Sequence, residues 1–218
     1  LSNSQFRKFF ELFKASTKLL DCTFNVEKNL KEKLDDLRLE AETAVREGIK
    51  HLILSDKGVD EKKAAIPMTL AIGAINSRLT DLGIRGFASI NVQTAEVLDT
   101  HSFAVLLGVG ATTINPYLVF DSIYQRYEKK LFGILNYKEC IKRYIKSVDN
   151  GLLKIMSKMG ISVLSSYRGG CNFETVGLSR TVVDDYFPGI TSKISGIGLN
   201  GIEKKIREIH KEAFESTE

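Results

Sequence analysis

The residues most suited to chemistry in this 218-residue chain are its three cysteines and three histidines. Cys22, Cys140 and Cys171 lie far apart, and no two of them have the short spacing of ligands in a zinc or iron–sulfur site. Scattered cysteines in odd number are typical of free thiols in a reducing compartment. We therefore expect unpaired thiols, a cytoplasmic protein, and neither a cysteine nucleophile nor a metal site.

His101 is the histidine with the best-placed acidic neighbours, because Glu96 and Asp99 shortly precede it. A carboxylate beside an imidazole can form a general base, so a small independent enzyme built around His101 and Glu96 is one hypothesis. No serine or cysteine nucleophile is tied to this pair, which favours a structural role for His101. His51 opens a predicted strand and His210 lies on a charged helix face, so neither is predicted to be a ligand.

Two glycine-rich segments resemble phosphate-binding turns. Gly196–Gly201 has the spacing GxGxxG, but a dinucleotide site also requires a second strand with an acidic residue about 20 residues further on. The sequence ends at Glu218 before such a strand, which favours a tight turn ahead of the final helix. Gly108–Ala111 lacks the third glycine and predicts a helix stop with close backbone packing.

The segment Ser166-Tyr167-Arg168-Gly169-Gly170 directly follows a predicted strand, where α/β proteins often place functional groups. Glycines there leave backbone N–H groups open, and the arginine fork suits a carboxylate or a phosphate. An anion-binding loop is therefore one interpretation. A loop held by an arginine hydrogen bond is the favoured one.

The elements that position these residues follow from hydrophobic periodicity. Helical spacing of apolar residues alternates with short apolar runs that predict buried strands. This alternation favours an α/β fold with a mostly parallel sheet and right-handed crossovers. The predicted helices cover residues 6–13, 30–45, 67–82, 100–107, 117–131, 137–159 and 199–214, with a short one near 173; the predicted strands cover 22–26, 51–54, 87–94, 112–114 and 161–165.

The charge distribution limits the classes of partner. The net charge of +4 arises from 31 basic and 27 acidic residues, and the two signs interleave along the predicted helices. Because a phosphate backbone requires a basic stripe, we expect no nucleic-acid binding. No apolar run approaches the about 20 residues that span a bilayer, so we expect no membrane partner.

Long collinear segments carry a more specific signal than any of these motifs. Asp149–Ser162, Ser166–Gly170 and Phe173–Leu178 resemble the late part of the central domain of the glutamate synthase large subunit. The resemblance corresponds to about the C-terminal two-thirds of that domain. Segments further upstream that resemble the same family are Ile53–Asp56, His101–Ala104, Gly108–Ala111 and Asn115–Leu118.

The resemblance implies a parent enzyme, an oxidoreductase, that makes two glutamates from glutamine and 2-oxoglutarate. In that family a glutaminase domain with an N-terminal cysteine releases ammonia, which crosses to a flavin barrel holding FMN and an iron–sulfur cluster. The central domain lies between them and resembles a partial or degenerate (β/α) barrel. The resemblance thus implies a central α/β unit over residues 1–198. A helix over residues 199–218 would lead toward a flavin domain outside this chain.

No catalytic, cofactor-binding or metal-binding residue carries over from the family. Leu1 stands where the glutaminase would need a cysteine, and Gln93, Leu98 and Ser102 replace a glutamate, an arginine and a histidine found in many relatives. We therefore expect a structural domain that is inactive alone, with the glutaminase and flavin domains as partners. The alternative is a free-standing anion-binding domain that uses the loop Ser166–Gly170.

The two ends of the chain are predicted to expose apolar surface that a parent would cover. Such surface would let the chain self-associate. The candidate residues are Phe6, Phe9, Phe10 and Phe13 near the start and the face Ile202–Ile209 near the end.

Overall fold

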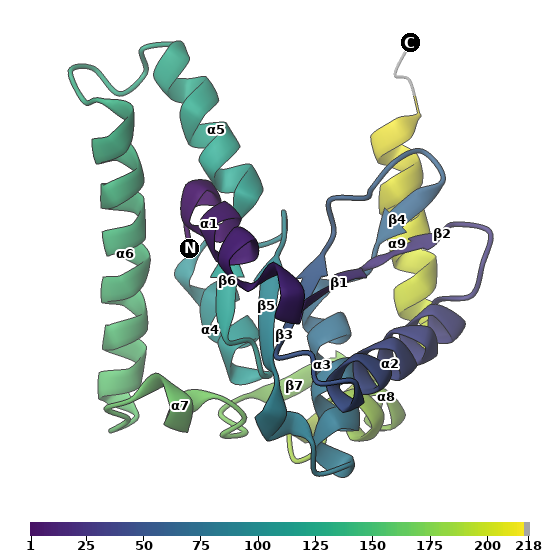
Figure 1. Cartoon of the computed structure of the whole chain (residues 1–218). Coiled ribbons are helices and arrows are strands. Elements are labelled where there is room, and N and C mark those ends of the chain that lie inside the picture. Colours follow the sequence, from purple (N-terminus) through teal and green to yellow (C-terminus); the bar gives the residue numbers. More distant parts are fainter. Residues whose placement is uncertain (216–218) are drawn as a thin grey trace.

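The computed structural model describes residues 1–215, which surround a four-stranded parallel sheet (Figure 1). Strands β1 (Thr17–Asp21), β3 (His51–Ser55), β5 (Ser89–Gln93) and β6 (Thr113–Asn115) lie side by side in chain order. Within residues 1–215, β1 and β6 do not pair, so the sheet is open and has half of the about eight strands of a closed (β/α) barrel. The predicted α/β class, parallel sheet and partial barrel are confirmed.

The hydrophobic core lies on the outer face of this sheet, under the helices α2 (Leu30–Arg46), α3 (Met68–Asp81) and α4 (Thr100–Gly108). Alternate strand residues such as Leu52 and Leu54 point to the helices and are fully buried. Asn29 caps α2, and Pro67 precedes the first residue of α3. Each helix follows a strand, as the alternation of patterns predicted.

The opposite face of the sheet is covered by α1 (Asn3–Phe13), which a short 3-10 turn (Lys14–Ser16) joins to β1 (Figure 1). The N-cap of α1 is Ser2, the residue just before the helix, and Gln5 completes a capping box with it. The phenylalanines of α1 were predicted to be exposed, but Phe6 is buried, and its ring stacks on that of Phe9. Phe13 alone among the four falls in the exposed class.

Helices α5 (Tyr117–Glu128) and α6 (Tyr137–Lys158) form a pair beside the β6 edge of the sheet (Figure 1). Tyr144 of α6 packs edge-on against Phe120 of α5. A small antiparallel pair, β2 (Thr23–Asn25) and β4 (Lys63–Ala65), lies beyond the other edge.

The C-terminal part forms a separate βαβ unit made of β7 (Glu174–Leu178), α8 (Arg180–Tyr186) and β8 (Thr191–Ile197). Its two strands are parallel and approach so closely that a Cβ on Gly196 would collide with the Gly177 carbonyl. In α9 (Leu199–Phe214), Gly201 packs on Ile197. These contacts account for the GxGxxG spacing as a packing feature.

Helix α9 packs back onto α2 rather than projecting away. Glu203 accepts a hydrogen bond from the Leu30 amide at 2.8 Å, and Arg207 donates to the Lys28 carbonyl at 2.8 Å. Ile202 and Ile206 lie against the core, whereas Ile209 is 57% exposed. The predicted exposure of this face is therefore wrong except at its end.

Two predicted elements are wrong in the segment that leads to β7. The apolar run Ile161–Ser165 has no neighbouring strand, because α5 and α6 border the β6 edge, and its second half begins the short helix α7 (Leu164–Tyr167). The short helix predicted near Phe173 is instead a stretch without regular secondary structure before β7. The pattern also missed β1, β4, β7, α8 and β8.

Candidate functional site

The inner face of the sheet carries side chains in layers, as the inside of a barrel does. Parallel pairing sets His51 beside Ser89, and places Asn91 between Ile53 and Thr113. Asn91 is 1% exposed and donates to the Ser89 hydroxyl at 2.9 Å and to the Leu52 carbonyl at 3.3 Å. Thr113 donates to the Asn91 side-chain oxygen at 2.8 Å, so this layer satisfies its own polar groups.

The layer at the carboxyl ends of the strands contains Ser55, Gln93 and Asn115. Ser55 donates to Gln93 at 3.0 Å, and Gln93 donates to Asn115 at 3.2 Å. Asn115 in turn donates to the Leu1 carbonyl at 3.0 Å and to the Asn3 side chain at 2.9 Å. The network therefore runs from the sheet through Leu1 to the start of α1.

At the other end of α1, two aromatic rings enclose His51. The Phe9 and Phe13 ring centroids lie 5.2 Å and 4.7 Å from the imidazole centroid. Burial, with a smaller contribution from Lys50, lowers the pKa of His51. His51 bonds the Ser89 hydroxyl at 2.8 Å through Nδ1, which fits a structural histidine.

Two carboxylates just beyond the ends of β3 and β5 accept hydrogen bonds from the backbone. Asp56 is buried, whereas Glu96 is exposed as a residue and only its carboxyl group is shielded from water. Asp56 accepts from the Thr94 hydroxyl at 2.6 Å and from the Ala95 amide at 2.9 Å. Glu96 accepts from the Met68 amide at 2.8 Å and so caps α3, while burial raises the pKa of Glu96. Both carboxylates therefore hold backbone in place.

The hypothesis of an enzyme built on His101 and Glu96 is wrong. The His101 side chain is exposed at the start of α4, and the Glu96 carboxylate is instead hydrogen-bonded to the Met68 amide at the start of α3. Asp99 is the N-cap of α4 and accepts from the Ser102 amide and hydroxyl at 2.8 and 2.7 Å. Both hydrogen bonds from Ser102 lower the pKa of Asp99, the amide bond more than the hydroxyl bond.

Backbone amides of the predicted anion loop Ser166–Gly170 already donate hydrogen bonds to carbonyl groups of the protein. The amides of Ser166, Arg168 and Gly170 donate to carbonyls within the segment 163–167, and that of Gly169 donates to the Gly108 carbonyl at 2.9 Å. Tyr167 is buried against the Phe173 ring. The open group of the loop is thus the Arg168 side chain, which donates through Nε to the Ala111 carbonyl at 3.1 Å.

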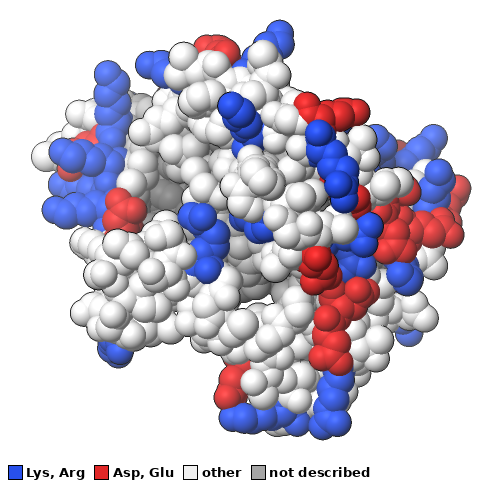
Figure 2. Space-filling model, turned by 60° about the horizontal axis from the view of Figure 1, so that its bottom comes forward, with Lys and Arg blue, Asp and Glu red and all other residues white. Residues whose placement is uncertain are grey.

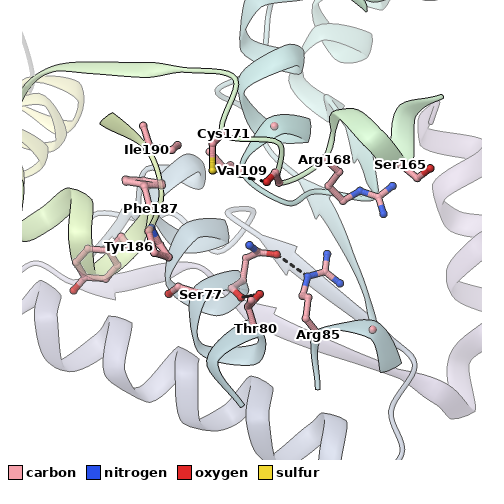
Figure 3. Close-up of a pocket in the computed structure, with 15 residues that line it drawn as sticks. Ser77, Thr80, Arg85, Val109, Ser165, Arg168, Cys171, Tyr186, Phe187 and Ile190 are labelled. Atoms are coloured by element: carbon pink, nitrogen blue, oxygen red, sulfur yellow. Dashed lines mark hydrogen bonds between the residues drawn. The ribbon is translucent and has the colours of Figure 1, made fainter. Parts of the chain in front are cut away.

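Arg168 borders a cavity of about 450 Å³ that the sequence did not predict (Figure 3). Arg85 lies on the same side of this cavity, and Tyr186, Phe187 and Ile190 lie on the other. No short sequence motif marks Arg85, because the residues that surround it come from distant segments. The elements α7, α8 and β7 lie at the bottom of Figure 1; the same side, seen in Figure 2, is hollowed near its centre, with acidic residues gathered toward one edge.

The cysteines are free thiols within residues 1–215, as predicted: Cys22 and Cys140 are buried and Cys171 is exposed. Burial raises the pKa of Cys22. Because the three stand on separate elements with different exposure, they do not fit an iron–sulfur cluster. Within residues 1–215 no helix is long and apolar enough to cross a membrane.

A family model described as the glutamate synthase central domain matches residues 1–179. The chain belongs to the glutamate synthase central-domain family. It is 49% identical to the glutamate synthase [NADPH] large chain of Azospirillum brasilense over 98% of its own length, and 39% identical to that of Bacillus subtilis over 99%. It is 40% identical to the ferredoxin-dependent glutamate synthase of Pyropia yezoensis over 86%. The chain spans 14% of the length of each of the first two relatives.

The solved structures similar to this central domain agree with a partial barrel. A flavocytochrome b2 mutant with benzoylformate superimposes with a TM-score of 0.51 at 13% sequence identity. The superposition covers 88% of this chain and 45% of that chain, and a second mutant of the same protein, with pyruvate bound, gives the same TM-score. At this identity the likeness concerns the fold alone.

Proposed function

We propose that this central domain is a structural spacer in a glutamate synthase that makes two glutamates from glutamine and 2-oxoglutarate. In this proposal the glutaminase and flavin domains of the same polypeptide are its partners, and ammonia passes between them. FMN and the iron–sulfur cluster belong to the flavin domain, and the chain alone has no turnover. Its free thiols fit a reducing, cytoplasmic location.

One observation carries the proposal: the layer at the carboxyl ends of the strands, where a barrel enzyme places its active site, is covered by the start of the chain and α1. The layers of polar side chains bond one another, and the bonds from Asn115 to Leu1 and Asn3 close the network against α1. A rigid, dry body suits a spacer, because ammonia that reaches bulk water is protonated and lost as a nucleophile.

The isolated 218-residue chain provides the first test. We expect no release of glutamate from glutamine and no binding of FMN in a fluorescence titration. Glutamate release, or FMN binding at a ratio of one per chain, would refute the proposal.

The intact large chain provides the second test, through the ratio of glutamine hydrolysed to 2-oxoglutarate consumed. A tight spacer keeps this ratio near one. We expect Phe9→Ala, which opens the contact between α1 and His51, to raise the ratio, because ammonia escapes. Leu12→Ala on the exposed side of the same helix is the matched control. A ratio that stays near one in Phe9→Ala while both rates fall together would argue against the spacer role.

We also propose that the isolated chain self-associates weakly through apolar groups that remain exposed. Phe13 and Ile209 lie at the ends of α1 and α9, and Val176 and Ile194 lie on the βαβ unit. Gel filtration at two concentrations tests this, and an elution volume independent of concentration would contradict it.

A further inference from the structure

Two arginines share the cavity beside α7 without an acidic partner. Arg85 and Arg168 both line it, and no aspartate or glutamate does. Neither guanidinium forms an ion pair with any acidic residue of the described part of the chain, whereas arginines elsewhere, such as Arg38 and Arg78, do. Half-buried cations without a counter-charge favour binding of an anion.

Arg85 is held rigidly by neutral acceptors. It donates to the Asn76 side chain at 2.6 Å, to the Ala88 carbonyl at 2.6 Å and to the Gly110 carbonyl at 2.8 Å. Burial, and then the nearby charge of Arg168, lower the pKa of Arg85 to about 10. Arg85 thus remains charged at neutral pH, and its positive charge is fixed at the wall of the cavity.

Arg168 supplies the open donors. Its Nε is used by the Ala111 carbonyl, and its two terminal nitrogens have no acceptor among residues 1–215. A guanidinium with a free edge can bind both oxygens of a carboxylate. The single anchoring bond orients the arginine and leaves its donors available.

The rest of the cavity indicates the kind of anion. Val109, Phe187 and Ile190 give it an apolar wall facing the arginines (Figure 3). The hydroxyls of Thr80 and Ser165 stand at its border. Its volume of about 450 Å³ lies within the range of small-ligand pockets, about 300–1,000 Å³.

We propose that this cavity binds a small organic carboxylate, with the charged end at Arg85 and Arg168 and the carbon skeleton against Val109, Phe187 and Ile190. The apolar wall favours such a molecule over inorganic phosphate. This site differs from the predicted loop site, because the donors are two guanidinium groups rather than the amides of residues 166–170. The proposal is independent of the spacer role, since it concerns the outer side of the domain.

Calorimetry on the 218-residue chain at low ionic strength tests the binding directly. The probes are glutarate, its neutral analogue glutaramide, and inorganic phosphate. We expect saturable binding of glutarate, no binding of glutaramide, and phosphate binding at least about tenfold weaker than glutarate. Equal binding of glutarate and glutaramide, or no heat with glutarate, would overturn the proposal, and phosphate binding as tight as glutarate would overturn the choice of an organic ligand.

Variants locate the site. Arg168→Ala should weaken glutarate binding at least about tenfold, and Arg168→Lys should recover only part of it, because lysine lacks the planar fork. Arg143→Ala, which removes an exposed arginine paired with Glu139 on α6, controls for general loss of positive charge. Unchanged affinity in Arg168→Ala would place the binding elsewhere and reject the site.

Cys171 provides a reporter in the wild-type chain, so the test does not depend on a variant that folds. It lines the cavity and is exposed, whereas Cys22 and Cys140 are buried. We expect iodoacetamide to modify Cys171 first and saturating glutarate, but not glutaramide, to slow that modification at least about fivefold. An alkylation rate that glutarate leaves unchanged would count against the cavity.

Discussion

The inner face of the sheet and the cavity beside Arg168 both contain several polar groups, but the two regions differ in whether these groups have partners within the protein. On the inner face the side-chain amides of Asn91, Gln93 and Asn115 donate to partners on neighbouring strands and on α1. In the cavity, Arg85 and Arg168 carry charge that no described residue neutralises. The first region includes the carboxyl ends of the strands, where barrel enzymes place their sites, yet it is the second that retains unused donors.

This difference shows how to separate a structural polar cluster from a binding site. A buried network in which each member has its partner stabilises one conformation and offers nothing to a ligand. An unmatched charge beside an open volume costs free energy until an anion arrives. The region to test is therefore identified by which polar groups lack a hydrogen-bond or ion-pair partner, and not by the number of polar residues.

The largest expected effect concerns the inner face. Asn91→Ala removes a buried side chain that bonds Leu52, Ser89 and Thr113, so we expect a loss of about 3 kcal/mol in the free energy of unfolding. Urea denaturation followed by circular dichroism measures it. Asn150→Ala, at an exposed position of α6, should change the stability by less than about 0.5 kcal/mol. A loss in Asn91→Ala as small as in this control would mean that the network contributes little.

A smaller effect is expected at the cavity wall. Gly110 has a φ of +130°, and a Cβ there would lie 2.5 Å from the Asn76 side-chain oxygen that receives the Arg85 bond. Gly110→Ala should therefore cost about 2 kcal/mol of stability and weaken the proposed glutarate binding. Thermal unfolding and calorimetry measure the two effects.

Gly86→Ala is the matched control for Gly110→Ala, because Gly86 borders the same cavity with nothing within 4 Å of a Cβ. It should leave both quantities unchanged within about 0.5 kcal/mol. If the two variants behave alike, the backbone argument at Gly110 fails.

The smallest effect is the pH dependence due to His51. Burial lowers its pKa in the folded state below the usual value of 6.5. As the pH falls through 6.5, the unfolded chain therefore takes up a proton first, and stability declines until the lowered folded pKa is passed. Glu96, whose pKa burial raises from 4.5, acts in the opposite direction, since its contribution is lost as the pH rises through its folded pKa.

The His51 contribution is isolated by comparing urea midpoints at pH 7.5 and 5.5 in wild type and in His51→Gln. The decline toward pH 5.5 should be smaller in His51→Gln and should persist in His101→Gln, which alters an exposed histidine. An equal decline in His51→Gln and wild type would show that the protonation of His51 is not linked to folding.

Much of the fold could be predicted because its helices carry local signals. The spacing of Leu30, Leu34 and Leu37 predicted α2, and Asn136 and Gly160 lie beside the two ends of α6, where the sequence predicted a long helix. Strands were less predictable, because a strand needs a neighbour. Ile161–Ser165 has the apolar residues but no adjacent edge, whereas β1 has polar and exposed residues yet pairs with β3.

Only one of the two arginines of the candidate site could be predicted, because the other is positioned by contacts that lie outside its own local sequence. Arg168 follows from its local glycines, but Arg85 reaches the cavity only through bonds to Asn76, Ala88 and Gly110. Nothing in the residues next to Arg85 encodes those contacts. The family resemblance identified the domain through long collinear segments, yet it did not indicate which arginines lack a partner.

The short turn Lys14–Ser16 between α1 and β1 has a mechanical consequence. The helix that covers the inner face and the strand at the edge of the sheet are joined by this short turn, so a displacement of one is transmitted to the other. Removing α1 to uncover the inner face would therefore also disturb β1, the edge strand that pairs with β3. The position of α1 over the inner face is thus maintained by chain connectivity as well as by hydrogen bonds.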